Sequence, residues 1–515
     1  MSLAVLNGFS LIGVHAFPVR VEAMLSSGLP AFHVVGLSDS DIRESRERVR
    51  GALISSGYAF PSGRLTVNLS PADLPKESAR FDLPIALGVL LASGQLRPAE
   101  DEDQIRLSDS GHFLLSQCIF LGELSLTGAL MNCHGALPIA VHAHRHHPNM
   151  SLFMPHSGAE FASRIKGLKI FGARTLSEVV GHLAGVSMLE VARPSALPHQ
   201  KSKIPQMCLS EVRGQSTAKI AIEVAAAGGH SVLMQGSPGS GKTMLAKRLA
   251  GLIPPLSDGA LLDAAMIQSM NGPLSSHIER PFRSPHHTAS SASIIGGGKK
   301  LTLGEVTLAH KGILFLDELG EFNKQVLESL REPMESGVIH VSRTTYRAEL
   351  PADFQLIAAM NPCPCGWFGH PDHQCRCVEE VVQRYLGKIS GPLLDRMDII
   401  VRMFVRTSED HSSDPSETSA VVAQRVKHAW QTQIDRQGCL NAKVSDLMFS
   451  RHMEMTDAAN RCLQSAKRTF GLSNRAVNRI SRVARTFADL SADRLITETS
   501  VAQAVSVRQE IKKPV

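Results

Sequence analysis

The stretch Gly236-Ser-Pro-Gly-Ser-Gly-Lys-Thr243 decides the fold of the central part of this 515-residue chain. It matches the pattern G-x-x-x-x-G-K-[ST] in full, with strand-like residues 231–235 before it and helix-like residues 244–252 after it. The glycines of such a loop let backbone N–H groups surround phosphates at a helix N-terminus. Lys242 would then reach the β- and γ-phosphates of ATP, and the Thr243 hydroxyl would ligate Mg²⁺. The predicted nucleotide-binding residues are Gly236, Ser237, Pro238, Gly239, Ser240, Gly241, Lys242 and Thr243.

Three polar residues follow predicted strands farther along the chain. Residues 313–316 (ILFL) are typical of a buried parallel strand, and Asp317 and Glu318 would emerge at its carboxyl end, where α/β sheets bind ligands. We expect Asp317 to hold Mg²⁺ through water and Glu318 to polarise the attacking water. A further strand predicted at 354–360 ends in Asn361, whose side chain would orient that water beside the γ-phosphate.

Four of the nine cysteines lie in one short segment. They form two C-x-C pairs separated by nine residues: Cys363, Cys365, Cys375 and Cys377. Four thiolates can hold a tetrahedral Zn²⁺ in a loop that is too short to build its own core. His370 and His373 are alternative ligands, and four reduced free thiols are the alternative interpretation. The spacing is unlike that of iron–sulfur proteins.

Composition and charge limit the class of protein. The chain is long enough for about three domains, and 43% hydrophobic residues exclude an overall disordered chain. Its first residues lack the features of a signal peptide, and no apolar run is long enough to span a membrane. We therefore expect a cytoplasmic protein without a membrane partner. Residues 421–515 hold 16 Lys/Arg against 8 Asp/Glu within a net charge of +6, which favours an anionic partner over the alternative of a solvated helical face.

Two polar segments predict the domain boundaries. We expect an α+β domain over 1–191, a linker over 192–206, an α/β core over 207–406, a loop over 407–418 and helices over 419–515. The first block mixes strand-like runs such as 19–23 and 65–69 with helical stretches at 39–55 and 84–92.

Several motifs resemble those of AAA+ ATPases of the helix-2-insert clade, and specifically the magnesium-chelatase-like ComM/YifB family. The motifs are LFLDEL (314–319), KISGPLLDR (388–396), VNLSPADLPK (67–76), RPFRSPHH (280–287), NPCPCG (361–366) and RAVNR (475–479). They span nearly the whole chain. The resemblance implies an α/β fold with a Lon-protease-like N-terminal domain, an AAA+ core and a helical lid. It also implies a helix-2 insert at about 272–298 and a pre-sensor hairpin at 338–350.

The same resemblance implies roles for two arginines. Arg396 resembles the arginine finger that reaches the γ-phosphate of a neighbouring subunit, which implies a ring, typically a homo-hexamer. Arg475 resembles the sensor-2 arginine of the lid. In the N-terminal block, Arg80 occupies the position of the Lon-type nucleophile and Ser78 lies two residues out of register, so we expect a domain without peptidase activity.

The helix predicted over 474–488 has two faces. Its apolar face carries Val477, Ile480, Ala484 and Phe487. Its second face carries Arg475, Arg479 and Arg482, with Arg485 beside them. We assign Arg475 to nucleotide. The alternative is that these arginines pair with acids across a subunit interface.

These features predict an ATP-driven hexameric motor that acts on branched or single-stranded DNA. The resemblance points to a helicase that promotes branch migration in recombination and natural transformation, with recombination proteins as partners. The predicted DNA contacts are Arg280, Arg283, Arg343, Arg347, Arg482 and Arg485. The alternative is a chelatase- or MoxR-like ATPase that remodels a protein partner. The basic C-terminal segment and the absence of an acidic linker favour DNA.

Overall fold

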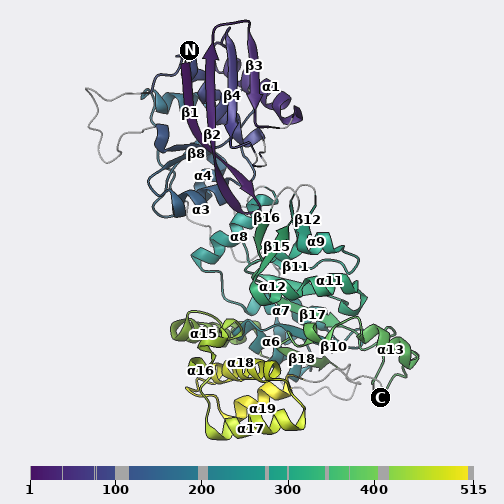
Figure 1. The fold of residues 1–515 in the computed structure, drawn as a ribbon. Coiled ribbons are helices and arrows are strands. Elements are labelled where there is room, and N and C mark those ends of the chain that lie inside the picture. Colours follow the sequence, from purple (N-terminus) through teal and green to yellow (C-terminus); the bar gives the residue numbers. More distant parts are fainter. Residues whose placement is uncertain are drawn as a thin grey trace. The chain divides into compact units, whose positions relative to one another are not determined.

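The fold is described from a computed structural model (Figure 1). The described residues are 2–37, 39–72, 74, 76, 78–98, 115–194, 207–272, 278–298, 301–342, 347–370, 372–403 and 417–508. The chain forms two compact units. The first comprises Met1–His199 with Ala265–Ile278 and Ser342–Ala348, and the second comprises Gln200–Ala264, Glu279–Val341 and Glu349–Val515.

The first unit is built on a seven-stranded mixed sheet of order β3-β4-β2-β1-β5-β8-β9. Its strands are β1 (Ser2–Ile12), β2 (His15–Ser26), β3 (Ala31–Val35), β4 (Arg64–Ser70), β5 (Cys118–Phe120), β8 (Ser151–Pro155) and β9 (Lys169–Ala173). A small two-stranded sheet adds β6 (Glu123–Leu124) and β7 (Leu130–Met131). The helices of this unit are α1 (Asp39–Ser55), α2 (Asp82–Ala92), α3 (Ala136–His146), α4 (His156–Ala162) and α5 (Leu176–Leu183). The α+β prediction for this block is confirmed.

The core of the first unit follows from alternation along its strands. Val19, Val21 and Ala23 of β2 are buried on one face, where α1 and α2 complete the core. Helix α2 is buried along almost its whole length, because it lies between the sheet and α1.

Arg80, at the position of the Lon-type nucleophile, has a structural role in the first unit. Arg80 is buried, and its Nη2 donates to the carbonyl oxygen of His134 at 2.9 Å. Asp82 is also buried, accepts hydrogen bonds from Ser45 and Arg48, and has its pKa raised to about 6 by burial. Both polar groups are therefore occupied in holding this domain together.

The second unit contains a five-stranded, all-parallel sheet of order β11-β14-β17-β10-β18. Its strands are β10 (Val232–Gly236), β11 (Phe282–Arg283), β14 (Ile313–Leu316), β17 (Gln355–Met360) and β18 (Ile399–Met403). Strands β10 and β14 are buried at every residue, as expected for a parallel sheet that is covered on both faces. The predicted strand at 313–316 is confirmed at both ends, and the α/β class is confirmed.

Several helices follow one another along this part of the chain, and the first two contact strands of the sheet. They are α6 (Ser216–Gly228), α7 (Lys242–Leu252), α8 (Asp258–Met270), α9 (Ser291–Ile295), α10 (Glu305–Leu308), α11 (Lys324–Ser329), α12 (Arg331–Ser336), α13 (Glu379–Leu386) and α14 (Gly391–Leu394). Two short strands, β12 (Gly296–Gly297) and β13 (Thr302–Leu303), follow α9, within and just beyond the predicted insert. The predicted hairpin is present as β15 (Val338–Ser342) and β16 (Arg347–Pro351).

The C-terminal region is helical, as predicted. It consists of α15 (Ser419–Gln437), α16 (Asp446–His452), α17 (Asp457–Thr469), α18 (Asn474–Leu490) and α19 (Glu498–Ser506). Val426 and Ala484 from these helices belong to the same buried cluster as Ala225, Leu245 and Ile357 around the sheet. The sheet and the C-terminal helices thus share one continuous core.

The predicted domain boundaries remain predictions. Most of the linker at 192–206 and of the loop at 407–418 lies outside the described residues. Among the helices that are described, none has the length and hydropathy needed to cross a membrane.

Candidate nucleotide site and metal centre

The loop 236–243 connects the carboxyl end of β10 to the N-terminus of α7. Gly239 and Gly241 adopt φ values of +76° and +87°, which side chains disfavour, so the pattern requires glycine there. Lys242 is buried, and its Nζ donates to the carbonyl oxygens of Gly236 at 2.8 Å and Ser237 at 2.9 Å. A third hydrogen bond of 3.2 Å joins Lys242 Nζ to Asn361 Oδ1. The loop and the end of β17 are therefore in direct contact.

Asp317 and Glu318 follow the carboxyl end of strand β14 and lie beside the same loop. Thr243 Oγ1 donates to Asp317 Oδ2 at 2.7 Å, and Glu318 follows with a φ of +54°. Burial lowers the pKa of Lys242, while the carboxylates of Asp317 and Glu318 oppose that shift. Three segments that are distant in sequence thus meet at the carboxyl ends of the neighbouring strands β10, β14 and β17.

The donor set fits ATP and Mg²⁺. The Thr243 hydroxyl and the Asp317 carboxylate supply adjacent oxygen atoms, which Mg²⁺ prefers as ligands. Lys242 supplies a cation beside backbone N–H groups at the start of an 11-residue helix. Residues 236–243 and Asp317 are therefore the groups that would hold the two ligands.

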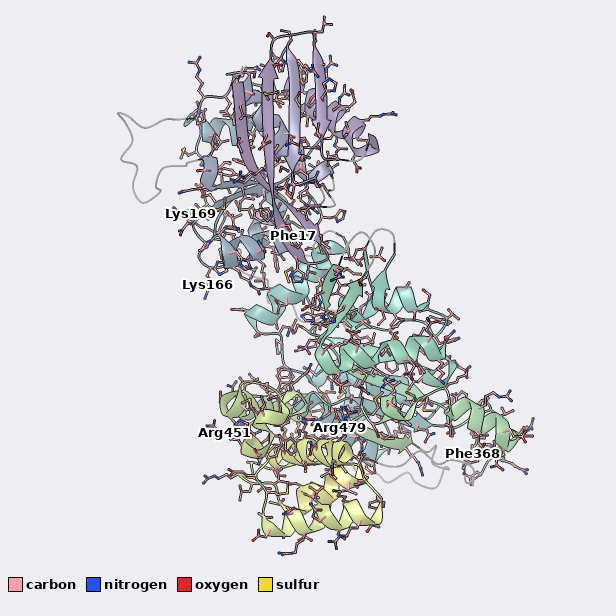
Figure 2. All side chains as sticks on the ribbon, viewed as in Figure 1. Phe17, Lys166, Lys169, Phe368, Arg451 and Arg479 are labelled. Atoms are coloured by element: carbon pink, nitrogen blue, oxygen red, sulfur yellow. The ribbon has the colours of Figure 1, made fainter. Side chains whose placement is uncertain are left out.

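A second cluster lies at the opposite ends of the strands. Arg396 is nearly buried, donates to the carbonyl oxygen of Pro392 at 2.8 Å and forms an ion pair with Glu335. Arg475, at the N-terminus of α18, is 69% exposed and lies 3.5 Å from the other carboxylate oxygen of Glu335. The hydrogen bond from Arg396 holds the pKa of Glu335 below its usual range. Arg479, labelled in Figure 2, forms an ion pair with Asp398.

These arginines line a cavity of about 660 Å³ together with residues at the amino ends of β10, β17 and β18. A strand of five residues such as β18 is about 16 Å long. Within one chain, Arg396 and Arg475 thus lie a strand length away from the loop that contains Lys242. The structure brings the two arginines together, and it does not bring them to the nucleotide loop of the same chain.

Two of the predicted DNA contacts, Arg280 and Arg283, are engaged with other residues of the same chain. The guanidinium group of Arg280 donates to the carbonyl oxygens of Lys311 at 2.7 Å and Pro254 at 2.9 Å, and burial lowers its pKa to about 10. Arg283 binds both carboxylate oxygens of Glu305, at 2.6 and 2.8 Å. Both side chains are therefore engaged in contacts within the second unit.

The predictions for α18 are partly wrong. Its apolar face is confirmed, since Ile480, Ala484 and Phe487 are buried. Arg485, however, is only 2% exposed and pairs with Asp489 of the same helix, so a DNA contact by Arg485 is ruled out in this structure. Arg482 donates to the carbonyl oxygen of Val444 at 2.9 Å. Arg479 and Arg485 pair with acids of their own chain, Asp398 and Asp489, and the alternative of pairs across a subunit interface stays a prediction.

The last two predicted DNA contacts belong to the hairpin. Arg347 is exposed at the start of β16. Arg343 lies outside the described residues.

The four predicted metal ligands come together. The Sγ atoms of Cys363 and Cys365 lie 3.3 Å apart, those of Cys363 and Cys375 3.7 Å, and those of Cys365 and Cys375 3.5 Å. Cys377 completes the group, in which all four Sγ atoms lie within 4.8 Å of one another. Thiolates at about 2.3 Å from a tetrahedral Zn²⁺ would be about 3.8 Å apart, so the cluster could hold such an ion.

The cysteine segment also contacts the nucleotide loop. Gly366 has a φ of +83°, and a Cβ atom there would lie 2.5 Å from Cδ of Pro238. Trp367 packs against His370 and His373, with ring centroids 5.1 and 4.2 Å apart. The histidines offered as alternative ligands thus pack against an indole ring, and among the described residues the four cysteines form the group that could hold a metal ion.

Comparison with known families gives a consistent result along the chain. Residues 208–411 match the family described as magnesium chelatase, subunit ChlI, residues 21–157 match subunit ChlI of Mg-chelatase, and residues 416–508 match the ChlI C-terminal family. The competence protein ComM of Haemophilus influenzae is 39% identical over 99% of this chain and 98% of its own length. The chain belongs to the magnesium-chelatase-like ComM/YifB family.

Other members of this family extend over the same range. The Escherichia coli protein YifB is 41% identical over 99% of this chain and 97% of its own length. A Mycobacterium tuberculosis protein, Rv2897c, is 39% identical over 95% of both chains. Membership of this AAA+ family indicates ATPase chemistry with ATP and Mg²⁺.

Two residues of the site were missed from the sequence. Glu335, which forms the ion pair with Arg396, lies in none of the motifs, so nothing in the sequence pointed to it. His287 lies 3.1 Å from Glu318, and its signal was its place in the motif at 280–287.

Proposed function

We propose that this protein is an ATP-driven motor that acts on DNA as a hexameric ring of identical subunits. By analogy with the relative named competence protein ComM, it would act as a helicase that promotes branch migration in recombination and natural transformation. The observation that carries the ring is the separation of Arg396 and Arg475 from Lys242 within one sheet. The arginines need a phosphate from another copy of the chain, and the nucleotide loop needs cations from another copy.

In this proposal each residue has a defined task. Lys242 neutralises the β- and γ-phosphates, and Thr243 and Asp317 hold Mg²⁺, which supplies charge stabilisation when bound. Glu318 accepts the proton of the attacking water. Asn361, which already contacts Lys242, orients that water. Arg396 and Arg475 of the adjoining subunit exchange Glu335 for the phosphates and stabilise the developing charge.

Mixing of two inactive variants tests action between subunits. Lys242→Ala removes the phosphate cation and Arg396→Ala removes the finger, so each variant alone should hydrolyse ATP poorly. A mixture should recover a measurable part of the wild-type rate, because some interfaces combine an intact loop with an intact arginine. Arg468 is an exposed lid arginine outside the cavity. A mixture of Lys242→Ala with Arg468→Ala should therefore give the highest rate of ATP hydrolysis that any mixture with Lys242→Ala can reach. No recovery in any ratio would contradict action in trans.

The excess of basic residues over 421–515 and the exposed Arg347 support DNA as the anionic partner. DNA should stimulate ATP hydrolysis, and affinity should fall with salt. Arg347→Ala should reduce the magnitude of the slope of log K against log salt by about 0.7–0.9 for one lost phosphate contact. Lys169→Ala, an exposed lysine of the first unit, serves as the charge-matched control.

The family descriptions favour a second candidate, an ATPase that remodels a protein partner as chelatase subunits do. Hydrolysis without any DNA stimulation, together with no DNA binding at low salt, would favour this candidate over the DNA motor. Recombination proteins are the expected partners only of the motor.

We further propose that Cys363, Cys365, Cys375 and Cys377 bind one Zn²⁺. The short Sγ distances, with all four Sγ atoms within 4.8 Å of one another, support this assignment. The ion would stabilise a loop whose Gly366 packs against Pro238, and it would therefore support the nucleotide loop.

A further inference from the structure

The residue before strand β10 lies beside the segment 396–398, which begins with the proposed finger arginine. Strands β10 and β18 are parallel neighbours, with Val232 opposite Ile399 (Figure 1). The residues that precede this pair, Ser231 and Asp398, are therefore neighbours as well. The N–H of Ile399 donates to the carbonyl oxygen of Ser231 at 3.0 Å, which continues the pairing to Ser231. The contact thus follows from the register of the sheet.

The hydroxyl group of Ser231 binds the backbone of this segment. The N–H of Asp398 donates to Ser231 Oγ at 2.9 Å. The single hydrogen of the hydroxyl can be donated to the carbonyl oxygen of Arg396 or to Asp398 Oδ2, each 3.0 Å from Oγ. The backbone N–H of Ser231 also donates to Asp398 Oδ2, at 3.0 Å. Because all three residues are buried, these bonds form away from bulk water.

Arg508 binds the same segment from the end of α19. Its Nη1 donates to the carbonyl oxygen of Met397 and, at 3.0 Å, to that of Asp398. Together with Ser231, Arg508 therefore provides a donor for each carbonyl oxygen of the segment 396–398. Buried carbonyl groups are costly to leave without a partner, so these two side chains define where the segment lies.

The position of the segment determines how far the guanidinium group of Arg396 reaches. That group donates to the carbonyl oxygen of Pro392 and forms the ion pair with Glu335, whereas Ser231 binds the backbone of Arg396. Removal of the Ser231 hydroxyl would thus keep the charge and length of the arginine side chain and shift the backbone that carries it. Charge stabilisation in a transition state depends on donors that are already in place, so such a shift should slow hydrolysis.

Strand β10 separates Ser231 from the nucleotide loop of its own chain. The strand has five residues, all buried, and is about 16 Å long. It pairs with β17 on one side and β18 on the other. A change in the side chain of Ser231 should therefore leave Lys242, at the far end of the strand, in place.

We propose that Ser231 is a positioning residue that, together with Arg508, fixes the segment 396–398 and thereby the reach of Arg396. The action of Arg396 on the nucleotide of a neighbouring copy rests on the proposed function. The dependence of Arg396 on Ser231 does not rest on it.

The first test compares kcat and KM for ATP in Ser231→Ala. Displacement of Arg396 should lower kcat by about 10–100-fold. KM for ATP should stay unchanged, because the loop that contains Lys242 is intact. Ser481→Ala is the matched control, since this buried serine binds the backbone of its own helix, α18, and should change neither constant. An unchanged kcat or a raised KM in Ser231→Ala would overturn the proposal.

A double variant tests whether Ser231 acts through Arg396. Ser231→Ala combined with Arg396→Ala should have the same kcat as Arg396→Ala alone, because no arginine is left to position. This comparison holds whichever nucleotide Arg396 reaches. If the double variant is slower than Arg396→Ala by the factor that Ser231→Ala shows by itself, the two effects are independent and the proposal is wrong.

Mixtures of variants then test the effect on a neighbouring copy. Ser231→Ala mixed with Lys242→Ala should recover activity, because some interfaces combine an intact loop with a correctly placed Arg396. Ser231→Ala mixed with Arg396→Ala should give no more than the two separate rates, since neither variant places the arginine. The opposite pattern would overturn the proposal. If Lys242→Ala with Arg396→Ala does not recover, the proposed action between copies fails, and the double variant still decides the role of Ser231.

Arg508→Ala replaces Ser231→Ala in these measurements if the serine variant does not fold. It removes the donor of the other two carbonyl oxygens of the segment. It should also lower kcat and leave KM for ATP unchanged. A kcat equal to that of the wild-type protein, or a raised KM, would show that these bonds do not set the place of Arg396.

Discussion

The two ends of the parallel sheet in the second unit present their charged groups in different ways. At the carboxyl ends, Lys242, Thr243 and Asp317 are hydrogen-bonded within one chain. At the amino ends, Arg396 and the exposed Arg475 share a single carboxylate, that of Glu335. The groups at the carboxyl ends bind one another within the chain, whereas the amino ends present two cations to one carboxylate. In the proposed ring, the carboxyl ends would hold ATP and Mg²⁺, and the amino ends would supply cations to the nucleotide of a neighbouring copy.

The largest expected effect is at the carboxyl end. Glu318→Gln should lower kcat by about 10²–10⁴-fold while ATP binding persists, because the amide cannot accept the proton and Thr243 and Asp317 remain. Lys242→Ala should instead lose ATP binding. Single-turnover hydrolysis and nucleotide binding measured side by side separate the two, and Glu321→Gln in the same turn is the control. Turnover of Glu318→Gln at the wild-type rate would exclude Glu318 as base.

The next effect separates two arginines of α18. Arg485→Ala should lower the free energy of unfolding by about 1–3 kcal/mol, because Asp489 loses one of its two cations and the carbonyl oxygens of Asp493 and Arg494 lose their donor. Arg475→Ala should change it by less than about 1 kcal/mol, since its contact is exposed. Denaturant titration measures both. Equal effects would show that Arg475 is as deeply involved in the core as Arg485.

The smallest effect concerns the support of the nucleotide loop by the cysteine segment. Gly366→Ala should raise KM for ATP by about tenfold, because its Cβ would displace Pro238 and its backbone is left-handed. Elemental analysis should still find about one Zn²⁺ per chain. Gly251→Ala, where a Cβ meets open space, is the control. A zinc content below a tenth of this in the wild-type protein, purified without chelator, would refute the zinc site.

The sequence predicts which residues lie together at the carboxyl ends of the parallel strands, but not which lie together at their amino ends. Residues 236–243, Asp317 and Asn361 each follow directly on a predicted strand, so adjacency in sequence gives adjacency in the fold. Arg396 and Glu335 are 61 residues apart, and no periodicity links them. Arg280 and Arg283 were assigned to DNA because the sequence does not reveal that Lys311 and Glu305 reach them.

One error on α18 had a visible signal. Arg485 and Asp489 are spaced i, i+4, the spacing at which opposite charges meet on a helix. The predicted basic face of this helix was defined by its arginines alone and did not take Asp489 into account. Tertiary contacts that a single sequence does not show also hold the pair: Arg436 and Asn441 bind Asp489, and Arg485 donates to the carbonyl oxygens of Asp493 and Arg494.

The continuous core between the sheet and the C-terminal helices has a mechanical consequence. Because Val426 and Ala484 pack in the same cluster as Leu245 and Ile357, the helices cannot swing away from the sheet without exposing apolar surface to water. Among the described residues, this packing therefore ties the sheet that carries the nucleotide loop to the helices that include Arg475. If the proposed ring forms, a rotation that begins at one interface should be carried across the subunit to the next interface, and the shared core should absorb little of it.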